Sequence, residues 1–500
     1  MSHIKRPTLC ALILLLLLCV LVPARVQATD ETEKAKNISG MKIVTASNGI
    51  PEPFRLFDGN IYSSRFTQEN ATLTLEYEDG IGSLYLLRTT APGGYTVTDN
   101  TSGTTVTAGQ TLLLHDFADL VALFGYAPTS ITICFGPEPM KLAELYVFTP
   151  GEVPDFVQKW NLPADNETDL LLLCAHGDDD QIFFAGILPY YAVHKGYQVQ
   201  VVYLTDHNNS GEYRVHEMLD GLWSFGMDIY PVFGIFPDYV FSNPQQLEAQ
   251  RGNIEYAYNF YRSHDLSRDE LLGFVVEQLR RFKPQVAVTH DFAGEYGHSH
   301  HMVCAELMAE AITISNDPTQ YPELAETYGL WDVPKTYIHL YEENPVVIDL
   351  DTPLECFDGK TAFEVSKFVA FPKHVSQCKD VSYHINPYKT AAAMKYSPCN
   401  YGLLRSTVGE DVQKNDLFEN VQSYEQQRLA EEARLAEEAR LAEEARLAEE
   451  ARLAEEARLA EEAQRAAEIR RITVTCIGSG VLILVFAVVL ILIRRKKKNV

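Results

Sequence analysis

Two short segments of the sequence concentrate side chains that bind metals and move protons. Residues 175–180 read "AHGDDD" and follow the apolar run "LLLLC", and residues 289–301 read "THDFAGEYGHSHH" and follow the apolar run "PQVAV". His176 and Asp179 are separated by two residues at a turn, so they can converge on one metal ion while Asp178 points past it. A third ligand must come from elsewhere, and the second segment, rich in imidazole, is the best source.

The elements that position these segments are predicted to be parallel strands. Between about residues 155 and 405, apolar runs of strand length alternate with helical stretches, one of which opens with the capping-box pattern of Ser267 and Glu270. Apolar strands separated by helices are typical of a parallel sheet covered on both faces. The region is therefore predicted to be a doubly wound α/β sheet, in which ligands bind outside the carboxyl ends of the strands.

At the same two segments the chain resembles the PIG-L/LmbE-like family, the N-acetylglucosaminyl-phosphatidylinositol de-N-acetylases and their bacterial relatives. That family carries A-H-P-D-D-E and G-H-P-D-H, which appear here as "AHGDDD" and "GHSHH". The resemblance implies a Rossmann-like fold and zinc-dependent removal of an acetyl group from an amino sugar or a similar amide. By the same resemblance, the zinc ligands are His176, Asp179 and His301, and the general base is Asp178.

The resemblance extends to further site residues. It implies that a charged His298 steadies the oxyanion or protonates the leaving amine, with help from Tyr296. "RVHE" (214–217) matches the family's R-x-x-E, so Arg214 is expected to face the substrate, and "KHVSQ" (373–377) resembles H-x-S-Q and makes His374 a pocket candidate. Histidines on other predicted helices are expected at the surface, among them His194 and His216.

Several positions depart from the family pattern. Gly177 replaces proline and loosens the turn, and Asp180 replaces a glutamate that is one methylene longer. Ser299 and His300 replace Pro-Asp, so His298 is expected to be a weaker acid and His300 competes with His301 as a ligand.

The residue types suit metal-assisted hydrolysis. Two histidines and an aspartate leave a coordination position open for water, and zinc lowers the pKa of that water toward about 7. A neighbouring carboxylate then takes the proton. Zn²⁺ is the expected ion, with Fe²⁺ as the alternative.

Residues 30–150 show a different pattern, in which short strands alternate apolar and polar residues between turn signals. In "ATLTLEY", Leu73, Leu75 and Tyr77 share one face. This region is predicted to be a β-sandwich. Its segment "FRLFDGNIYSSRFT" (54–67) resembles discoidin-like, galactose-binding-like domains, which implies carbohydrate binding; a structural spacer is the alternative.

Residues 428–463 are six copies of "RLAEEA". On a helix a period of six turns successive leucines by about 240°, so they cannot form a coiled-coil seam. Arginine and glutamate at spacings of three and four instead predict a solvated helical stalk over residues 420–471. A disordered acidic linker and a helix-mediated oligomer are the alternatives.

The two ends predict a single-pass membrane protein. Residues 1–28 read as a secretory signal peptide, residues 472–493 as a transmembrane helix and residues 494–500 as a basic cytoplasmic tail. The bulk of the chain is then expected outside the cytoplasm, at the cell surface; lysines near the end of "KKNV" make the lumenal face of the endoplasmic reticulum the alternative.

Charge and cysteine content narrow the function further. The formal net charge of -26 argues against a nucleic-acid partner. Of six cysteines between the two predicted apolar ends, the last three are the best candidates for disulfides: Cys356, Cys378 and Cys399. The sequence therefore predicts a membrane-tethered, zinc-dependent N-deacetylase of an amino-sugar glycan or glycolipid. The alternatives are a hydrolase of another small amide and a non-catalytic carbohydrate-binding surface protein.

Overall fold

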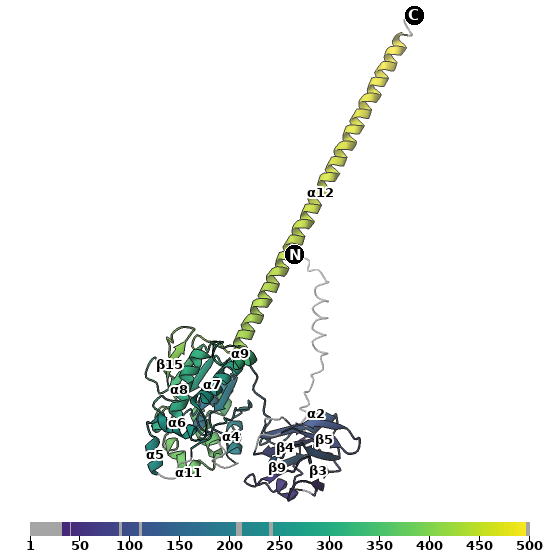
Figure 1. Ribbon diagram of the computed structural model, residues 1–500. Coiled ribbons are helices and arrows are strands. Elements are labelled where there is room, and N and C mark those ends of the chain that lie inside the picture. The colour runs from purple at the N-terminus through teal and green to yellow at the C-terminus, as the bar shows by residue number, and fades with distance from the viewer. Residues whose placement is uncertain are drawn as a thin grey trace, which may run out of the picture. The chain divides into compact units, whose positions relative to one another are not determined.

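The computed structural model describes residues 33–40, 42–89, 93–109, 113–206, 213–239 and 244–496. The predicted signal peptide and the last four residues of the predicted tail lie outside these ranges. The chain divides into two compact units, the first ending at Val421 and the second beginning at Gln422 (Figure 1).

The first unit begins with two antiparallel sheets that share one apolar core. One sheet has the order β1-β3-β8-β5-β6 and the other β2-β9-β4-β7. Alternate residues of β3, such as Leu73 and Leu75, meet Leu84 and Leu86 of β4 in that core. The strands are β1 (Val44–Asn48), β2 (Arg65–Phe66), β3 (Ala71–Glu76), β4 (Ser83–Arg88), β5 (Tyr95–Asp99), β6 (Thr105–Ala108), β7 (His115–Asp119), β8 (Ser130–Phe135) and β9 (Lys141–Phe148), with the short helices η1 (Pro53–Phe57) and α2 (Leu120–Phe124).

The rest of the first unit is built on a mixed six-stranded sheet of order β11-β10-β12-β13-β15-β14. Its first four strands run parallel, and β15 pairs antiparallel with both β13 and β14. Leu172 of β10 is buried on one face of the sheet and Leu173 on the other, which explains the continuous apolar run. The strands are β10 (Leu170–Cys174), β11 (Val199–Tyr203), β12 (Val286–Thr289), β13 (Lys335–His339), β14 (Pro345–Val347) and β15 (Asn400–Ser406).

Helices cover both faces of this sheet. On one face, α7 contributes Leu271, Val275 and Leu279 to the core beside α6 and α8. The predicted capping box of Ser267 and Glu270 is present at the start of α7. On the other face, α4 packs Met218 and Leu222 into a second core. The helices are α3 (Asp179–Ile182), α4 (Arg214–Trp223), α5 (Pro244–Gln250), α6 (Ile254–Arg262), α7 (Arg268–Phe282), α8 (Ser299–Ile314), α9 (Pro322–Tyr328), α10 (Ala362–Val365) and α11 (Cys378–Val381), and the short turns are η2 (Pro189–His194), η4 (Glu295–Gly297), η5 (Glu355–Phe357), η6 (Ser366–Ala370), η7 (Phe371–Lys373) and η8 (Ser382–His384).

The strand order places the two histidine-rich segments side by side. From β10 the chain passes to β11 on one side and later returns to β12 on the other side of β10. The sheet order therefore reverses between β10 and β12, and loops leaving their carboxyl ends diverge to leave a crevice. Residues 175–180 follow β10 and residues 290–301 follow β12, so both segments lie at this crevice.

The histidine at position 216 is buried, although the sequence predicted a surface position. His216, on α4, has no exposed surface, because it packs against His115 of β7 in the N-terminal sheets. Nε2 of His115 lies 2.7 Å from Nδ1 of His216, and Nε2 of Gln158 donates to Oδ1 of Asp220 at 2.6 Å. The N-terminal sheets therefore hold α4 through buried polar contacts as well as apolar ones. His194, by contrast, is exposed as predicted.

The second unit is one continuous helix, α12 (Tyr424–Lys496). Arg440 pairs with Glu437 and Glu444 at 2.6 and 2.5 Å, and equivalent pairs recur along the repeats. The repeat leucines are about half exposed; Leu435 is 51% exposed, for example. Among the described residues, α12 is the helix long and apolar enough to cross a membrane, judged by length and composition. The part of the predicted tail that is described, residues 494–496, continues the same helix.

The cysteines expected to pair are free thiols. Cys356 is exposed beside His194, with Sγ 3.9 Å from Nδ1, and the thiol of Cys378 donates to the carbonyl oxygen of Phe371 at 3.3 Å. Cys399 is buried and also free. Each thiol has its own local environment, so the disulfides expected among these three are not present.

The buried His115–His216 pair predicts a pH-dependent stability. Burial lowers the pKa of His216 to about 4 and, together with the neighbouring His216, lowers that of His115 well below its usual value. Both rings stay neutral when folded but gain a proton on unfolding below about pH 6.5, so the pair stabilises the fold above that pH and less so as pH falls. Between pH 7 and pH 4, the lowered pKa of His216 alone should reduce the free energy of unfolding by about 3 kcal/mol.

Thermal unfolding midpoints across this range should fall more steeply for the wild type than for His216→Gln. His194→Gln, at an exposed histidine, is the control and should follow the wild type. Parallel curves for wild type and His216→Gln would contradict this expectation.

Candidate metal centre and active site

The first half of the site is the turn that follows β10. The chain leaves β10 at Cys174, turns at Gly177 and begins α3 at Asp179. The turn packs closely on α4, because a Cβ atom at Gly177 would lie 2.4 Å from Sδ of Met218. Glycine at this position thus lets the turn lie close to the side chain of Met218 on α4. The backbone N–H of His176 donates to Oδ2 of Asp179 at 2.7 Å, which fixes the carboxylate beneath the imidazole.

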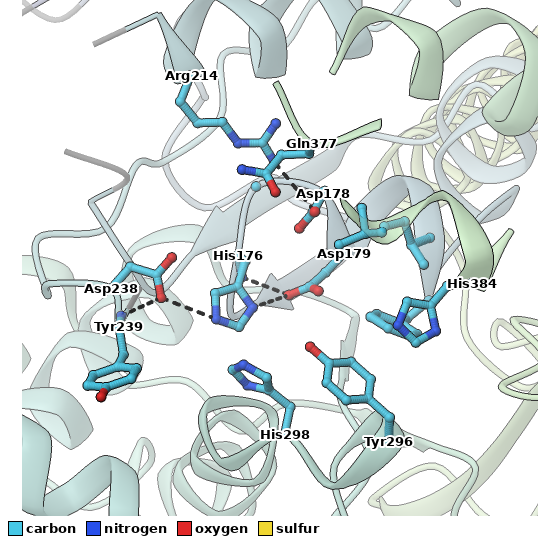
Figure 2. Close-up of a pocket in the computed structure, with 14 residues that line it drawn as sticks. His176, Asp178, Asp179, Arg214, Asp238, Tyr239, Tyr296, His298, Gln377 and His384 are labelled. Carbon is cyan, nitrogen blue, oxygen red and sulfur yellow. Dashed lines mark hydrogen bonds and ion pairs between the residues drawn. The ribbon is translucent and has the colours of Figure 1, made fainter. Parts of the chain in front are cut away.

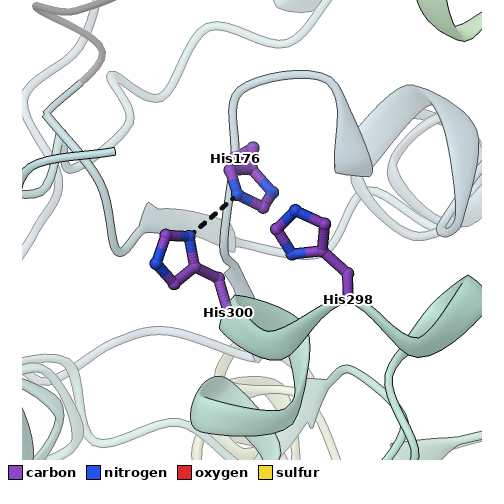
Figure 3. A group of neighbouring side chains, drawn as sticks. All are labelled: His176, His298 and His300. Atoms are coloured by element: carbon purple, nitrogen blue, oxygen red, sulfur yellow. Dashed lines mark hydrogen bonds between the residues drawn. The ribbon is translucent and has the colours of Figure 1, made fainter. Parts of the chain in front are cut away.

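The second half is the loop between β12 and α8. Tyr296 lies in the left-handed region at φ 49°, a costly conformation for a bulky side chain and one that clusters at functional sites. His298 occupies the N-cap position of α8, and His300 and His301 lie in the first turn of that helix. His298 (Figures 2 and 3) and His300 (Figure 3) extend from this helix end toward His176. His301 approaches the same ring, with Nε2 3.3 Å from Nδ1 of His176.

The three predicted metal ligands converge. Nδ1 of His176 lies 3.3 Å from Oδ2 of Asp179 and 3.3 Å from Nε2 of His301, and Nε2 of His301 lies 3.3 Å from Oδ1 of Asp179. Donor atoms around a tetrahedral ion with bonds of 2.0–2.1 Å stand about 3.4 Å apart. The triangle therefore fits a divalent transition-metal ion, and its nitrogen and oxygen donors suit zinc or iron(II).

The charge state of Asp179 is also right for a ligand. Burial acts to raise the pKa of its carboxyl, but the imidazoles of His301, His290 and His176 outweigh burial and hold this pKa well below its usual range. Asp179 is therefore ionised, as a metal ligand must be.

A second buried carboxylate, Glu295, orients His301. Its Oε2 accepts from Nδ1 of His301 at 2.6 Å and from Nδ1 of His290 at 2.8 Å, and its Oε1 accepts from Nδ1 of His339 at 2.5 Å. These hydrogen bonds leave Nε2 of His301 facing Asp179. A carboxylate behind a metal-binding imidazole fixes the ring and its tautomer and raises its basicity.

A polar cavity of about 180 Å³ opens beside the triangle (Figure 2). It brings together side chains that follow β10 and β12 with others from α4 and from the 377–384 segment. The polar lining residues are His176, Asp178, Asp179, Arg214, Asp238, Tyr239, Tyr296, His298, Gln377 and His384.

Asp178 and Arg214 face each other across one wall of this cavity. Oδ2 of Asp178 lies 3.7 Å from Nη2 of Arg214. Burial raises the pKa of the Asp178 carboxyl, and Arg214 partly offsets the rise. His374 does not line the cavity; its Nδ1 lies behind Arg214, 3.1 Å from Nη1. His374 therefore supports the arginine, while Gln377, at the end of the same "KHVSQ" segment, lines the cavity.

His298 lines the cavity, but its surroundings disfavour the cation expected from the sequence. Burial first, and then the neighbouring His176, lower the pKa of His298 well below its usual value. Tyr296 shares the same wall, and burial raises the pKa of its hydroxyl well above 10. Both residues therefore offer neutral hydrogen-bond donors to the cavity.

Sequence reasoning missed several residues of this site. Asp238 follows an extended segment beside β11, and its Oδ1 lies 3.5 Å from Nε2 of His176. Glu295 and His290 were in the quoted segment but received no role, and His339 ends β13. A histidine at the end of a third parallel strand was the signal that could have found His339.

Part of the chain is similar to known deacetylases. Residues 171–312 match the family model described as PIG-L: GlcNAc-PI de-N-acetylase. A 1D-myo-inositol 2-acetamido-2-deoxy-alpha-D-glucopyranoside deacetylase 2 of Saccharopolyspora erythraea is 41% identical over 70 residues, which are 14% of this chain and 24% of the relative. A deacetylase of the same description from Streptomyces avermitilis is 28% identical over 186 residues, which are 34% of this chain and 60% of the relative.

The chain thus spans between a quarter and three fifths of these two curated relatives. Among solved structures, the N,N'-diacetylchitobiose deacetylase from Pyrococcus horikoshii is 18% identical, with a TM-score of 0.33, and the match covers 47% of this chain and 82% of that one.

Replacing Glu295 with glutamine should weaken metal binding. A glutamine amide cannot accept from three imidazole N–H groups, so His301 loses its fixed orientation, and losing such a partner typically costs about 10 to 100-fold in metal affinity. Competition with a chromophoric chelator measures the dissociation constant of Zn²⁺ directly. Glu306→Gln, at a carboxylate 40% exposed on α8, is the matched control and should bind like the wild type. Equal zinc affinities for wild type and Glu295→Gln would show that the Glu295 carboxylate does not support metal binding by His301.

Proposed function

We propose that this protein is a metal-dependent N-deacetylase that hydrolyses the acetamide of an N-acetylglucosamine-containing glycan or glycolipid, with Zn²⁺ as the ion and Fe²⁺ as the alternative. The observation that carries the proposal is the triangle of His176, Asp179 and His301, with a separate carboxylate, Asp178, lining the adjoining cavity. The PIG-L match over residues 171–312 and the acetamido-sugar deacetylases among the relatives support the same reaction.

The ligands in this proposal are His176, Asp179 and His301. When bound, the ion lowers the pKa of a water molecule and polarises the amide carbonyl.

Asp178 then has the role of general base. Its carboxylate takes a proton from the attacking water and returns it to the nitrogen of the leaving amine. Water and amide thus become acetic acid and amine, which separate as acetate and the protonated amine. Burial raises the pKa of this carboxyl, which makes it a stronger base toward the attacking water. Arg214, 3.7 Å away, keeps the carboxylate facing the cavity.

Tyr296 and His298 have the role of hydrogen-bond donors. Both line the cavity, and the raised pKa of Tyr296 keeps its hydroxyl protonated. A donor aimed at the developing oxyanion of an amide is commonly worth about 3 to 4 kcal/mol. In this proposal Tyr296 and His298 act in their neutral forms. His298 stabilises the developing oxyanion by hydrogen bonding, and Asp178 transfers the proton from water to the leaving amine.

The proposal extends to organisation and place. We assign the catalytic region, residues 155–405, to a doubly wound, Rossmann-like fold, and residues 30–150 to a carbohydrate-docking β-sandwich. Two sheets around one core and helices on both faces of the parallel strands support these assignments. The apolar end of α12 would anchor the enzyme, with its bulk outside the cytoplasm and the "RLAEEA" helix as a stalk.

The experiment that tests the proposed function is acetate release by the purified protein from N-acetylglucosamine-containing glycans and glycolipids. Asp178→Asn removes the base and should reduce the rate by about 10² to 10⁴-fold. His301→Ala removes a ligand and should abolish turnover at ordinary ion concentrations. His194→Ala, at an exposed imidazole, is the control and should match the wild type. If both site variants release acetate as fast as the wild type, the assignment of the site is wrong; if the wild type turns over only other small amides, the substrate class is wrong.

A further inference from the structure

A second triangle of donor atoms lies on the other side of the His176 ring. Nε2 of His176 lies 3.4 Å from Nδ1 of His300 and 3.5 Å from Oδ1 of Asp238, and Nδ1 of His300 lies 3.6 Å from the same carboxylate oxygen. His176 and Asp238 appear together in Figure 2, and His176 and His300 in Figure 3. This triangle uses Nε2 of His176, whereas the catalytic triangle uses Nδ1.

The spacing of these atoms is that of metal ligands. Direct hydrogen bonds to imidazole nitrogens are short in this site: Glu295 accepts at 2.5 to 2.8 Å. Contacts of 3.4 to 3.6 Å are longer than the 2.7–3.2 Å of a well-formed hydrogen bond. They match the separation of about 3.4 Å between donors around a tetrahedral ion, as do the 3.3 Å contacts of the catalytic triangle.

We propose that His176, His300 and Asp238 form a second divalent transition-metal site, joined to the first through the two nitrogens of one imidazole. The proposal rests on the proposed function only in assigning the first ion to Nδ1 of His176. His298 completes the set, because His176, His298 and His300 offer ligand atoms within 4.8 Å of one another (Figure 3). Three imidazoles and a carboxylate suit zinc, copper and iron better than magnesium or calcium.

His300 is held in place for this role. Its ring stacks on Tyr261 of α6, with centroids 5.3 Å apart, and lies 5.9 Å from the ring of Phe260. The imidazole is 1% exposed, so it is part of the packed interior. The motif the chain resembles has aspartate at this position, so the second site depends on a residue by which this sequence departs from that motif.

Binding of the second ion releases one proton. With ions on both nitrogens the His176 ring is an imidazolate, so its Nε2 proton leaves to the solvent when the second ion binds. The second ion should therefore bind more weakly than the first, because it must displace that proton from its contact with Asp238. Once bound it takes His298 as a ligand and so removes one of the proposed oxyanion donors, which makes excess ion inhibitory.

Metal stoichiometry of the full chain in detergent tests the second site. The protein is stripped with a chelator, dialysed against increasing Zn²⁺ and analysed for bound zinc per chain. We expect two ions for the wild type and one for His300→Phe, which keeps a ring between Phe260 and Tyr261 but has no ligand atom. His264→Phe, at an exposed histidine beside Phe260, is the matched control and should bind two. Asp238→Asn preserves the shape of the side chain and should lower the affinity for the second ion by at least about 10-fold. This variant replaces His300→Phe in the test if His300→Phe does not fold.

The outcomes separate this inference from the proposed function. One zinc per wild-type chain, unchanged in His300→Phe, overturns the second site and leaves the catalytic site standing. Two zinc ions in both wild type and His300→Phe put the second ion elsewhere and also overturn it. No zinc in the wild type overturns both the second site and the metal-dependent reaction.

Discussion

The structure of the site depends on the burial of two carboxylates away from water. Asp179 is 2% exposed and Glu295 is fully buried, and an ionised carboxylate in such a place is costly unless it is paired and hydrogen-bonded. His290 and His301 lie against both carboxylates and so satisfy the two together. The contacts of Asp179 with imidazoles hold nitrogen and oxygen donor atoms at metal-binding distance, and the same contacts fix the loop between β12 and α8 against the turn after β10.

The sequence predicted the parts of this arrangement that are local. An apolar run followed by polar residues marks the carboxyl end of a buried strand, and the reversal of strand order between β10 and β12 then brings His176 and His301 together. Asp238 depends on how a distant segment approaches the crevice beside β11, which neither spacing nor periodicity encodes. The misassignment of His216 has the same origin: a helical pattern does not tell which other surface will cover a given face.

Helix α4 links the N-terminal sheets to the cavity. Arg214, at its first turn, faces Asp178, while His216 two residues later is buried against His115 of β7. Since side chains two apart on a helix point to different faces, the two contacts hold α4 from different sides. The position of Arg214 is thus set both by the His374 segment behind it and by the N-terminal sheets, which gives these sheets a structural part in the site beside any docking role.

The central claim is that one ion is bound by loops more than a hundred residues apart. Anomalous diffraction from crystals of the protein grown with Zn²⁺ tests it most directly, because the signal locates the ion without reference to activity. The account predicts a peak about 2.0 to 2.2 Å from Nδ1 of His176, from Nε2 of His301 and from a carboxylate oxygen of Asp179. A fully loaded crystal whose zinc lies elsewhere, with these three side chains unligated, would contradict it.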